Sequence, residues 1–242
     1  MHNVAMPTLS IVIPTKNEQR YLPGVLEAIR RQTLQPQEII VADAHSTDDT
    51  RVIAEQHGAR VVDGGLPSTG RNRGAKVATG EVIFFFDADV VIQDDQFLEK
   101  ALAEFHKRGF GIASCNLGVI DGNTYDVFVH KFYNRYARLL GAFHPHAPGF
   151  CIFVQRSVHE KIGGFDESIM FCEDHEYAGR AAKISTFGFL DSVKIFVTTR
   201  RQERDGRFSM GIKYILAELH LIFLGPIRGD KFKYGFGYEE KK

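Results

Sequence analysis

The sequence has few cysteines, no excess charge of either sign and no long uninterrupted hydrophobic run. Its 3 cysteines are odd in number and show neither a C-x-x-C pair nor zinc-finger spacing, which argues against a disulfide framework and a structural zinc site. The 30 basic and 30 acidic side chains cancel, so no overall field recruits a nucleic acid, and we expect no nucleic-acid partner. These absences favour a protein of the reducing cytoplasm whose binding depends on local clusters.

From the sequence we expect neither a secretory leader nor a membrane span. Its start, MHNVAMPTLS, shows no basic segment followed by an apolar run. The longest apolar tract, residues 212–227, is interrupted by Lys213, Glu218 and His220, and it is short and charged for a hydrocarbon core that needs about 20 residues. We therefore expect a cytoplasmic protein. The tract is compatible with core packing, with contact in a homodimer, or with peripheral contact at the inner face of a membrane.

Two common nucleotide-binding motifs are missing. Residues 64–74 are glycine-rich and basic and would suit an anion near a helix start, but Arg71 and Asn72 stand where a P-loop requires Lys and Ser or Thr. No G-x-G-x-x-G follows the first apolar run, as a dinucleotide site would require. ATP hydrolysis and nicotinamide chemistry both lose support.

Short apolar runs alternate with amphipathic patterns over the first half of the chain. Runs rich in branched and aromatic residues predict strands buried on both faces of a parallel sheet at Leu9 to Pro14, Glu38 to Ala42 and Val82 to Phe86. Helical patterns follow them at residues 22–29, 46–58 and 97–109.

This alternation predicts an α/β fold with a mostly parallel central sheet flanked by helices. A chain of 242 residues with 44% hydrophobic content can bury one substantial core, so we expect a single globular domain over residues 1–205. Ligands of such sheets bind at the carboxyl ends of the strands, which makes residues 1–110 the ligand-binding half. Residues 111–205 have a less regular pattern and are expected to add to the same sheet, and residues 206–242 to form an amphipathic helix and tail.

Asp87 and Asp89 directly follow the third apolar run, at the edge of the sheet where ligands bind. Carboxylate oxygens suit Mg²⁺ or Mn²⁺, which usually combine one or two protein carboxylates with phosphate oxygens. Two solvated acids in a turn would explain an isolated D-x-D pattern equally well.

Polar residues gather after the other two runs as well. The first run ends in PTKNE, and the second ends in Asp43 followed by AHSTDDT. Ser46 and Asp49 occupy capping-box positions for the next helix, whereas Asp43 precedes the cap and has no such role.

Four segments in order, SIVIPTKNE, EIIVADAHSTDDT, GRNRGAKVATGEVIFFFDAD and GGFDESIMFCEDHEYAGRAAK, resemble the signature of family-two glycosyltransferases, inverting enzymes of the GT-A fold. The resemblance covers roughly residues 9–185, and four motifs in order are far more specific than any one of them. It implies a GT-A, Rossmann-like sheet and a sugar donor linked to UDP or GDP.

The resemblance also implies roles for individual residues of the donor site. Those in the nucleotide pocket are Pro14, Asn17, Glu18, Asp43 as acceptor of a hydrogen bond from the base, Arg71, Asn72, and Asp87 near the ribose and metal. Asp89 matches the direct ligand of Mg²⁺ or Mn²⁺.

On the acceptor side, Asp174 matches the catalytic base, which takes the proton of the attacking hydroxyl. Glu176 and Arg180 repeat the E-D-x-D-L-x-x-R pattern, but His175, Glu176 and Tyr177 depart from its commoner residues. With no enzyme nucleophile assigned, a single displacement should invert the anomeric carbon.

The sequence leaves the roles of two further groups of residues open. Arg200, Arg201, Arg204 and Arg207 form a basic cluster, which is either a solvated helix face or a clamp for the diphosphate or an anionic lipid-phosphate acceptor. His144 and His146 could supply a metal ligand, shape the acceptor site or serve only the structure.

The sequence therefore predicts a metal-dependent inverting glycosyltransferase that moves a sugar from a nucleoside diphosphate to a saccharide or lipid-linked acceptor. A sugar-phosphate nucleotidyltransferase is a first alternative, although IPTKNE stands where its Gly-rich basic loop would follow the first strand. A non-catalytic sugar-nucleotide-binding subunit is a second.

Overall fold

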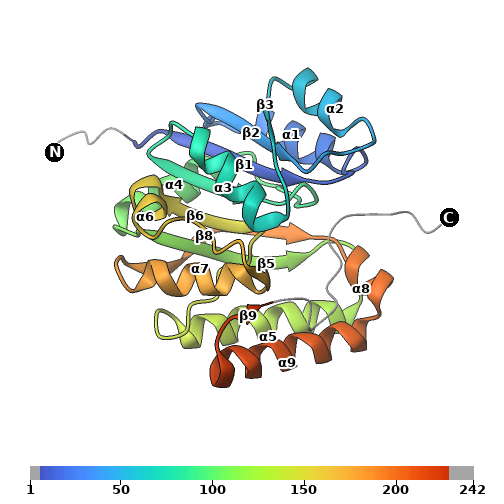
Figure 1. Ribbon diagram of the computed structural model, residues 1–242, viewed down its shortest axis with the longest axis vertical. Helices are drawn as coiled ribbons and strands as arrows, with labels where there is room; N and C mark the ends of the chain where they lie inside the picture. Colours follow the sequence, from blue (N-terminus) through green and yellow to red (C-terminus); the bar gives the residue numbers. More distant parts are fainter. Residues whose placement is uncertain (1–5, 229–242) are drawn as a thin grey trace.

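The computed structural model describes residues 6–228, without the side chain of Arg201. Its helices and strands follow one another in the order shown in Figure 1. They are β1 (Leu9–Thr15), α1 (Leu22–Arg30), β2 (Glu38–Asp43), α2 (Thr50–Gln56), β3 (Arg60–Asp63), α3 (Pro67–Val77), β4 (Val82–Phe86), α4 (Phe97–Lys107), β5 (Ile112–Val119), α5 (Thr124–Leu140), β6 (Cys151–Gln155), α6 (Arg156–Lys161), β7 (Ile169–Phe171), α7 (Glu173–Ala182), β8 (Phe187–Val197), α8 (Arg200–Asp205), α9 (Arg207–Leu224) and β9 (Ile227–Arg228).

The main sheet has seven strands in the order β3-β2-β1-β4-β6-β5-β8. Strands β1 to β4 run parallel, as their continuous apolar sequences predict, and β6 lies antiparallel between β4 and β5. The reversal at β6 adds the second half of the chain to the same sheet. The expected α/β fold with a mostly parallel sheet is confirmed.

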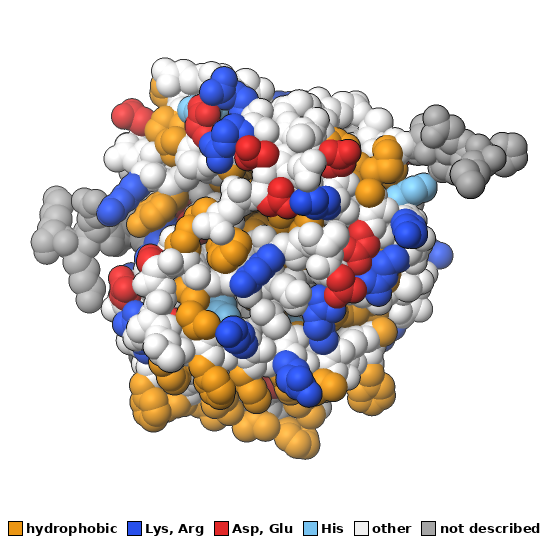
Figure 2. Space-filling model, turned by 180° about the vertical axis from the view of Figure 1, so that it is seen from behind, with side chains coloured by type: hydrophobic (Ala, Val, Ile, Leu, Met, Phe, Trp, Pro, Cys, Tyr) orange, Lys and Arg blue, Asp and Glu red, His pale blue; other side chains and the backbone are white. Residues whose placement is uncertain are grey.

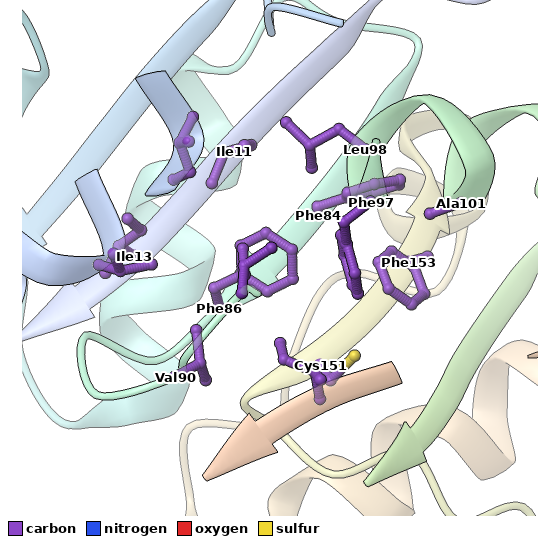
Figure 3. Packing of buried hydrophobic residues seen from close by; sticks show 14 of the residues in the cluster. Ile11, Ile13, Phe84, Phe86, Val90, Phe97, Leu98, Ala101, Cys151 and Phe153 are labelled. Carbon is purple, nitrogen blue, oxygen red and sulfur yellow. The ribbon is translucent and has the colours of Figure 1, made fainter. Parts of the chain in front are cut away.

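Aromatic side chains fill the core beside β4. Phe84 meets Phe153 of β6 edge to face, with ring centroids 4.3 Å apart, and Phe97 of α4 covers the same face of the sheet (Figure 3). Burying each such ring stabilises the fold by about 1.5–3 kcal/mol. This packing holds β4 rigidly, and with it the start of the acidic segment that follows.

The expected order of elements was wrong in one place, because it omitted β3 and α3. Residues 67–77 are helix α3. A Cβ atom on Gly74 would lie 2.3 Å from Cγ1 of Val12, and one on Gly70 would lie 3.1 Å from Cβ of Pro14. These glycines are therefore needed because α3 packs closely on β1.

The predicted cap of the second helix was also wrong. Helix α2 begins at Thr50 with Asp49 as its N-cap residue, and the Asp49 side chain makes no capping hydrogen bond. The hydroxyl of Ser46 donates instead to Asp43.

Helices α5 and α9 lie side by side at one end of the molecule, beyond α7 (Figure 1). Asn134 of α5 bonds the backbone of Leu117 in β5, so α5 is held to the main sheet. Arg207 of α9 pairs with Asp126 of α5 at 3.1 Å, and β9, which follows α9, pairs with β7. None of the helices in residues 6–228 is both long and apolar enough to cross a membrane.

Candidate active site

The strand ends of the parallel sheet bring the predicted donor-site residues to one edge. Asn17 follows β1 with a positive φ of 54°, and its backbone N–H donates to Ser46 while its side-chain oxygen accepts from the Thr47 N–H. The loops after β1 and β2 are therefore tied together. Pro14 lies within β1, against α3.

Asp43 at the end of β2 is fully buried and organises its own loop. Its carboxylate accepts hydrogen bonds from the hydroxyl of Thr15 and from the backbone N–H and hydroxyl of Ser46, and it pairs with Arg51 at 3.3 Å. The sequence assigned Asp43 no local role, but these contacts hold the carboxylate at the edge of the sheet.

Arg71 of α3 connects two acidic segments of the chain. Its guanidinium donates to Asp87 at 3.0 Å and to Glu173 at 2.9 Å, and its side chain is only 3% exposed. Glu173 immediately precedes Asp174, so this one arginine fixes the acidic segment after β4 against the start of α7.

Arg200 makes a second connection across the site. It pairs with Asp89 at 3.0 Å and with Glu18 at 3.2 Å, and its guanidinium lies 4.0 Å from the centroid of the Tyr21 ring. Burial raises the pKa of Glu18 to about 7, although Arg200 opposes the shift. Arg200 thus lies at the predicted metal ligand, whereas Arg204 and Arg207 of the same cluster pair with Asp205 and Asp126.

Two of the predicted site residues, Asn72 and Arg201, have no described contact with the other residues of the donor site. The side chain of Asn72 bonds the backbone of Phe165 and the carboxylate of Glu167, and so fastens α3 to the loop before β7. Arg201 lies in α8, but its side chain is outside the described part of the chain.

Asp174 lies in the first turn of α7 and is held by backbone N–H groups. The N–H of Gly149 donates to its Oδ2 at 2.7 Å, and the N–H of His175 donates to its Oδ1 at 2.9 Å. Burial raises the pKa of Asp174 despite these donors and the charge of Arg71. Burial also raises the pKa of Glu173. A buried carboxyl whose pKa is raised is suited to accept a proton.

No sequence pattern indicated that the N–H of Gly149 donates to Asp174, or that Glu173 pairs with Arg71. Glu173 and Arg71 are 102 positions apart, so no local spacing could reveal the pair. The positive φ of Cys172, 57°, was equally hidden, because a cysteine gives no signal for a left-handed backbone.

A compact group of possible metal ligands lies beside the acceptor side of the site. His144, His146 and Glu218 bring one ligand atom each to within 4.8 Å of one another in the described part of the chain. The ring of His146 lies 4.5 Å from that of His175, and burial lowers the pKa of His175 to about 3.

The acidic edge, formed by Asp87 and Asp89 after β4, offers ligand atoms to Mg²⁺ or Mn²⁺. Asp87 and Asp89 supply the oxygen donors that these ions prefer, and their side chains are 35% and 23% exposed. A hollow lined by Asp89, Tyr21 and Gly24 opens beside them. The donor set fits a divalent ion, with the Arg200 guanidinium as its competitor at Asp89.

Comparison with known proteins finds glycosyltransferases. The family model described as glycosyl transferase family 2 matches residues 10–163. The uncharacterized glycosyltransferase RP339 of Rickettsia prowazekii is 26% identical over 206 residues, which cover 80% of this chain and 64% of that protein. A shorter match to the PGL/p-HBAD biosynthesis glycosyltransferase of Mycobacterium tuberculosis is 34% identical over 109 residues and covers 41% of this chain and 42% of that one. The chain spans 64% of the length of the Rickettsia relative.

Solved structures share the fold. The mannosyltransferase PcManGT from Pyrobaculum calidifontis, in complex with GDP-Man and Mn²⁺, matches with a TM-score of 0.66 and 19% identity over 92% of this chain and 72% of that one. TarS 1–349 of S. aureus, in complex with UDP-GlcNAc, matches with a TM-score of 0.65 and 21% identity over 88% of this chain and 66% of that one. At these identities the likeness concerns the fold alone, and it confirms the GT-A architecture.

Proposed function

The chain belongs to glycosyltransferase family 2, and we propose that it transfers a sugar from a UDP- or GDP-linked donor to an acceptor hydroxyl or lipid phosphate, with inversion. The observation that carries this proposal is the joining of two acidic sites through one buried arginine. Arg71 holds Asp87 on the donor side and Glu173, next to Asp174, on the acceptor side. The distance between leaving group and base is thereby fixed by the fold.

On the donor side, the loops after β1 and β2 form the pocket for the nucleotide. Asn17 and Asp43 are held there by mutual loop contacts, and they supply polar groups to the base and ribose. Arg200 is poised between Asp89 and Glu18, so it can pair with phosphate oxygens when the diphosphate enters. This arrangement positions the sugar at the edge of the sheet.

A Mg²⁺ or Mn²⁺ ion bound at Asp89, with Asp87 beside it, would neutralise the charge that develops on the departing diphosphate. A protein of the same fold supports this cofactor, since the structure of PcManGT is a complex with GDP-Man and Mn²⁺.

On the acceptor side, Asp174 takes the proton of the attacking hydroxyl. Its buried position raises its pKa, and the two backbone N–H donors keep its carboxylate in one orientation. Because no side chain is needed as a nucleophile, attack from the face opposite the diphosphate inverts the anomeric carbon in one step.

The experiment is hydrolysis of, or transfer from, a panel of UDP- and GDP-sugars by the purified protein with Mn²⁺ or Mg²⁺. Release of the nucleoside diphosphate that disappears with chelator and in Asp89→Ala supports the proposal. Pyrophosphate release from a nucleoside triphosphate would favour a nucleotidyltransferase instead, and metal-dependent nucleotide binding without turnover of any donor would leave a binding subunit.

The acceptor is proposed to be reached at the surface of an anionic membrane. Large apolar side chains of α5, α9 and the loop after α5 are exposed at one end of the molecule, where they form the orange edge in Figure 2. They are Phe128, Phe132, Leu139, Phe143, Phe208, Ile215, Phe223 and Leu224. The acids of the two helices, Asp126 and Glu218, turn inward and are paired, while Lys131 and Arg135 are exposed. An apolar face with basic neighbours suits anionic lipid.

Sedimentation with vesicles tests the membrane contact. The protein should sediment with vesicles containing phosphatidylglycerol and less with neutral phosphatidylcholine. The double variant Phe132→Ser and Phe223→Ser should lose binding, while Val52→Ser, which removes a half-exposed apolar side chain from α2, should keep it. A concentration-dependent dimer in solution without vesicle binding would assign the face to a second copy of the chain.

A further inference from the structure

We propose that His144, His146 and Glu218 bind a Zn²⁺ ion that fastens α9 to the loop before β6. This site is separate from the acidic edge at Asp89, and it goes beyond the proposed sugar transfer. The three ligand atoms come from two segments that are 72 to 74 positions apart in the sequence, and they lie within 4.8 Å of one another. Two imidazoles and one carboxylate form a donor set typical of Zn²⁺.

The distances within the cluster suit this ion. Nε2 of His146 lies 3.1 Å from Oε2 of Glu218, and Nε2 of His144 lies 3.1 Å from Oε1. Zinc bonds of about 2.0–2.1 Å in a tetrahedron place neighbouring ligand atoms roughly 3.3 Å apart. Both contacts of Glu218 therefore lie close to the separation that a tetrahedral ion requires.

The protonation of His146 supports a cation between the ligand atoms. Its Nδ1 lies 2.8 Å from the backbone carbonyl oxygen of His144. A carbonyl oxygen only accepts, so this hydrogen bond requires the proton on Nδ1, and a neutral imidazole then turns its Nε2 lone pair toward Glu218. A lone pair facing a carboxylate oxygen needs a cation or a second proton between them. In a zinc-bound histidine, the ring nitrogen that does not bind the metal also usually donates to a carbonyl or carboxylate oxygen.

Glu218 is likewise held by a hydrogen bond from a neighbouring side chain. The hydroxyl of Tyr136 in α5 donates to Oε1 of Glu218 at 2.8 Å, which leaves the remaining lone pairs of the carboxylate to the histidines. His146 is almost fully buried, whereas the side chains of His144 and Glu218 are 31% and 20% exposed. The Nε2 atom of His144 is nevertheless buried and has no hydrogen-bond partner among the described residues, which leaves it available to an ion.

The site has a consequence for the acceptor side. The loop that carries His144 and His146 continues to Gly149, whose N–H holds the Asp174 carboxylate. Zinc would therefore connect the exposed helix α9 to the residue that orients the base, and its removal should loosen both.

Cobalt titration of the chelator-treated full chain tests the site, because four-coordinate Co²⁺ in an N and O environment absorbs visible light and Zn²⁺ displaces it. One equivalent should bind to the wild type, and the absorbance should persist in Asp89→Ala, so that a failure of the acidic edge does not affect the result. Glu218→Gln should lose the absorbance, and His130→Ala, which changes a histidine of α5 outside the cluster, should keep it.

Zn²⁺ should also raise the unfolding temperature of the wild type and of His130→Ala but not of His144→Ala. The His144 side chain is partly exposed, so this variant tests the site even where Glu218→Gln fails to fold. Absence of visible absorbance in the wild type, binding unchanged in both cluster variants, or binding lost in Asp89→Ala would each overturn the proposal. In these outcomes a proton, not a metal, joins His146 to Glu218.

Discussion

The proposed donor edge, with Asp87 and Asp89, and the proposed acceptor side, with Asp174, hold their acids in different ways. Asp87 and Asp89 remain partly exposed, and each faces an arginine. Asp174 is held by backbone N–H groups from two segments, and burial raises its pKa. An acid beside a cation suits exchange of that cation for a metal and phosphate, whereas an acid that is held by backbone N–H groups and has a raised pKa suits acceptance of a proton. The two regions are thus prepared for two different steps.

The largest effect should come from removing the base. Asp174→Asn should lower the transfer rate by about 10²–10⁴-fold, the usual contribution of a positioned general base. Nucleotide binding should stay within about twofold, because the side chain is on the acceptor side. Initial rates and calorimetric binding of UDP or GDP measure the two effects. Asp191→Asn, a change at an exposed acid of β8, is the matched control. A variant with wild-type transfer would remove Asp174 from this role.

The link between the two regions is tested by Arg71→Met. This change leaves Asp87 and Glu173 without their shared partner, and breaking a buried ion pair typically costs about 3–5 kcal/mol. Urea unfolding should show this loss of stability. Arg51→Met removes an arginine that also joins two acids, Asp43 and Asp63, but is 38% exposed, so it should cost less. Equal losses in the two variants would mean that Arg71 is not the main connection.

The third prediction concerns competition at Asp89. Arg200→Met removes the guanidinium that lies 3.0 Å from this carboxylate, so Mn²⁺ should bind the nucleotide-free protein more tightly. A gain of about two- to fivefold is expected, as for other partly exposed ion pairs. Calorimetry with Mn²⁺ measures it, with Arg204→Met, paired to Asp205 in the same helix, as control. Weaker Mn²⁺ binding in Arg200→Met would show that Arg200 supports the metal site.

The sequence predicted the donor edge better than the acceptor side, and the reason is physical. Continuous apolar runs identify parallel strands, and acids after a strand lie at its carboxyl end whatever the rest of the chain does. The short strand β3, RVVD, has too few apolar residues for such a signal. Glycines that allow close packing look like loop glycines, which hid α3.

Contacts between distant segments leave no local pattern at all. The pairing of Arg71 with Glu173, of Gly149 with Asp174 and of His146 with Glu218 arises only when β6 and the helices after it have packed. The resemblance to a family located Asp174, but the groups that hold it depend on the tertiary fold.

A further prediction concerns the pH dependence of stability through Glu18. Its carboxyl has a pKa of about 7 in the folded protein against the ordinary 4.5, chiefly because it is buried. Between these values the folded state binds more protons than the unfolded state, so stability falls as pH rises from about 4.5 to about 7. Glu18→Gln removes this titrating group and its contribution to the pH dependence of stability. The unfolding temperature of the variant, relative to the wild type, should therefore rise over that range and level off above it.

This comparison isolates Glu18 from other titrating groups. Burial lowers the pKa of His159 to about 4, which gives the opposite slope, but that slope is present in both proteins and cancels. Glu55→Gln, a change at an exposed glutamate of α2, should follow the wild type at every pH. A difference between Glu18→Gln and the wild type that is constant from pH 4.5 to 7.5 would mean that Arg200 keeps Glu18 charged throughout. The edge at Asp89 would then hold Glu18 as an ion, and the contrast with Asp174 would become sharper.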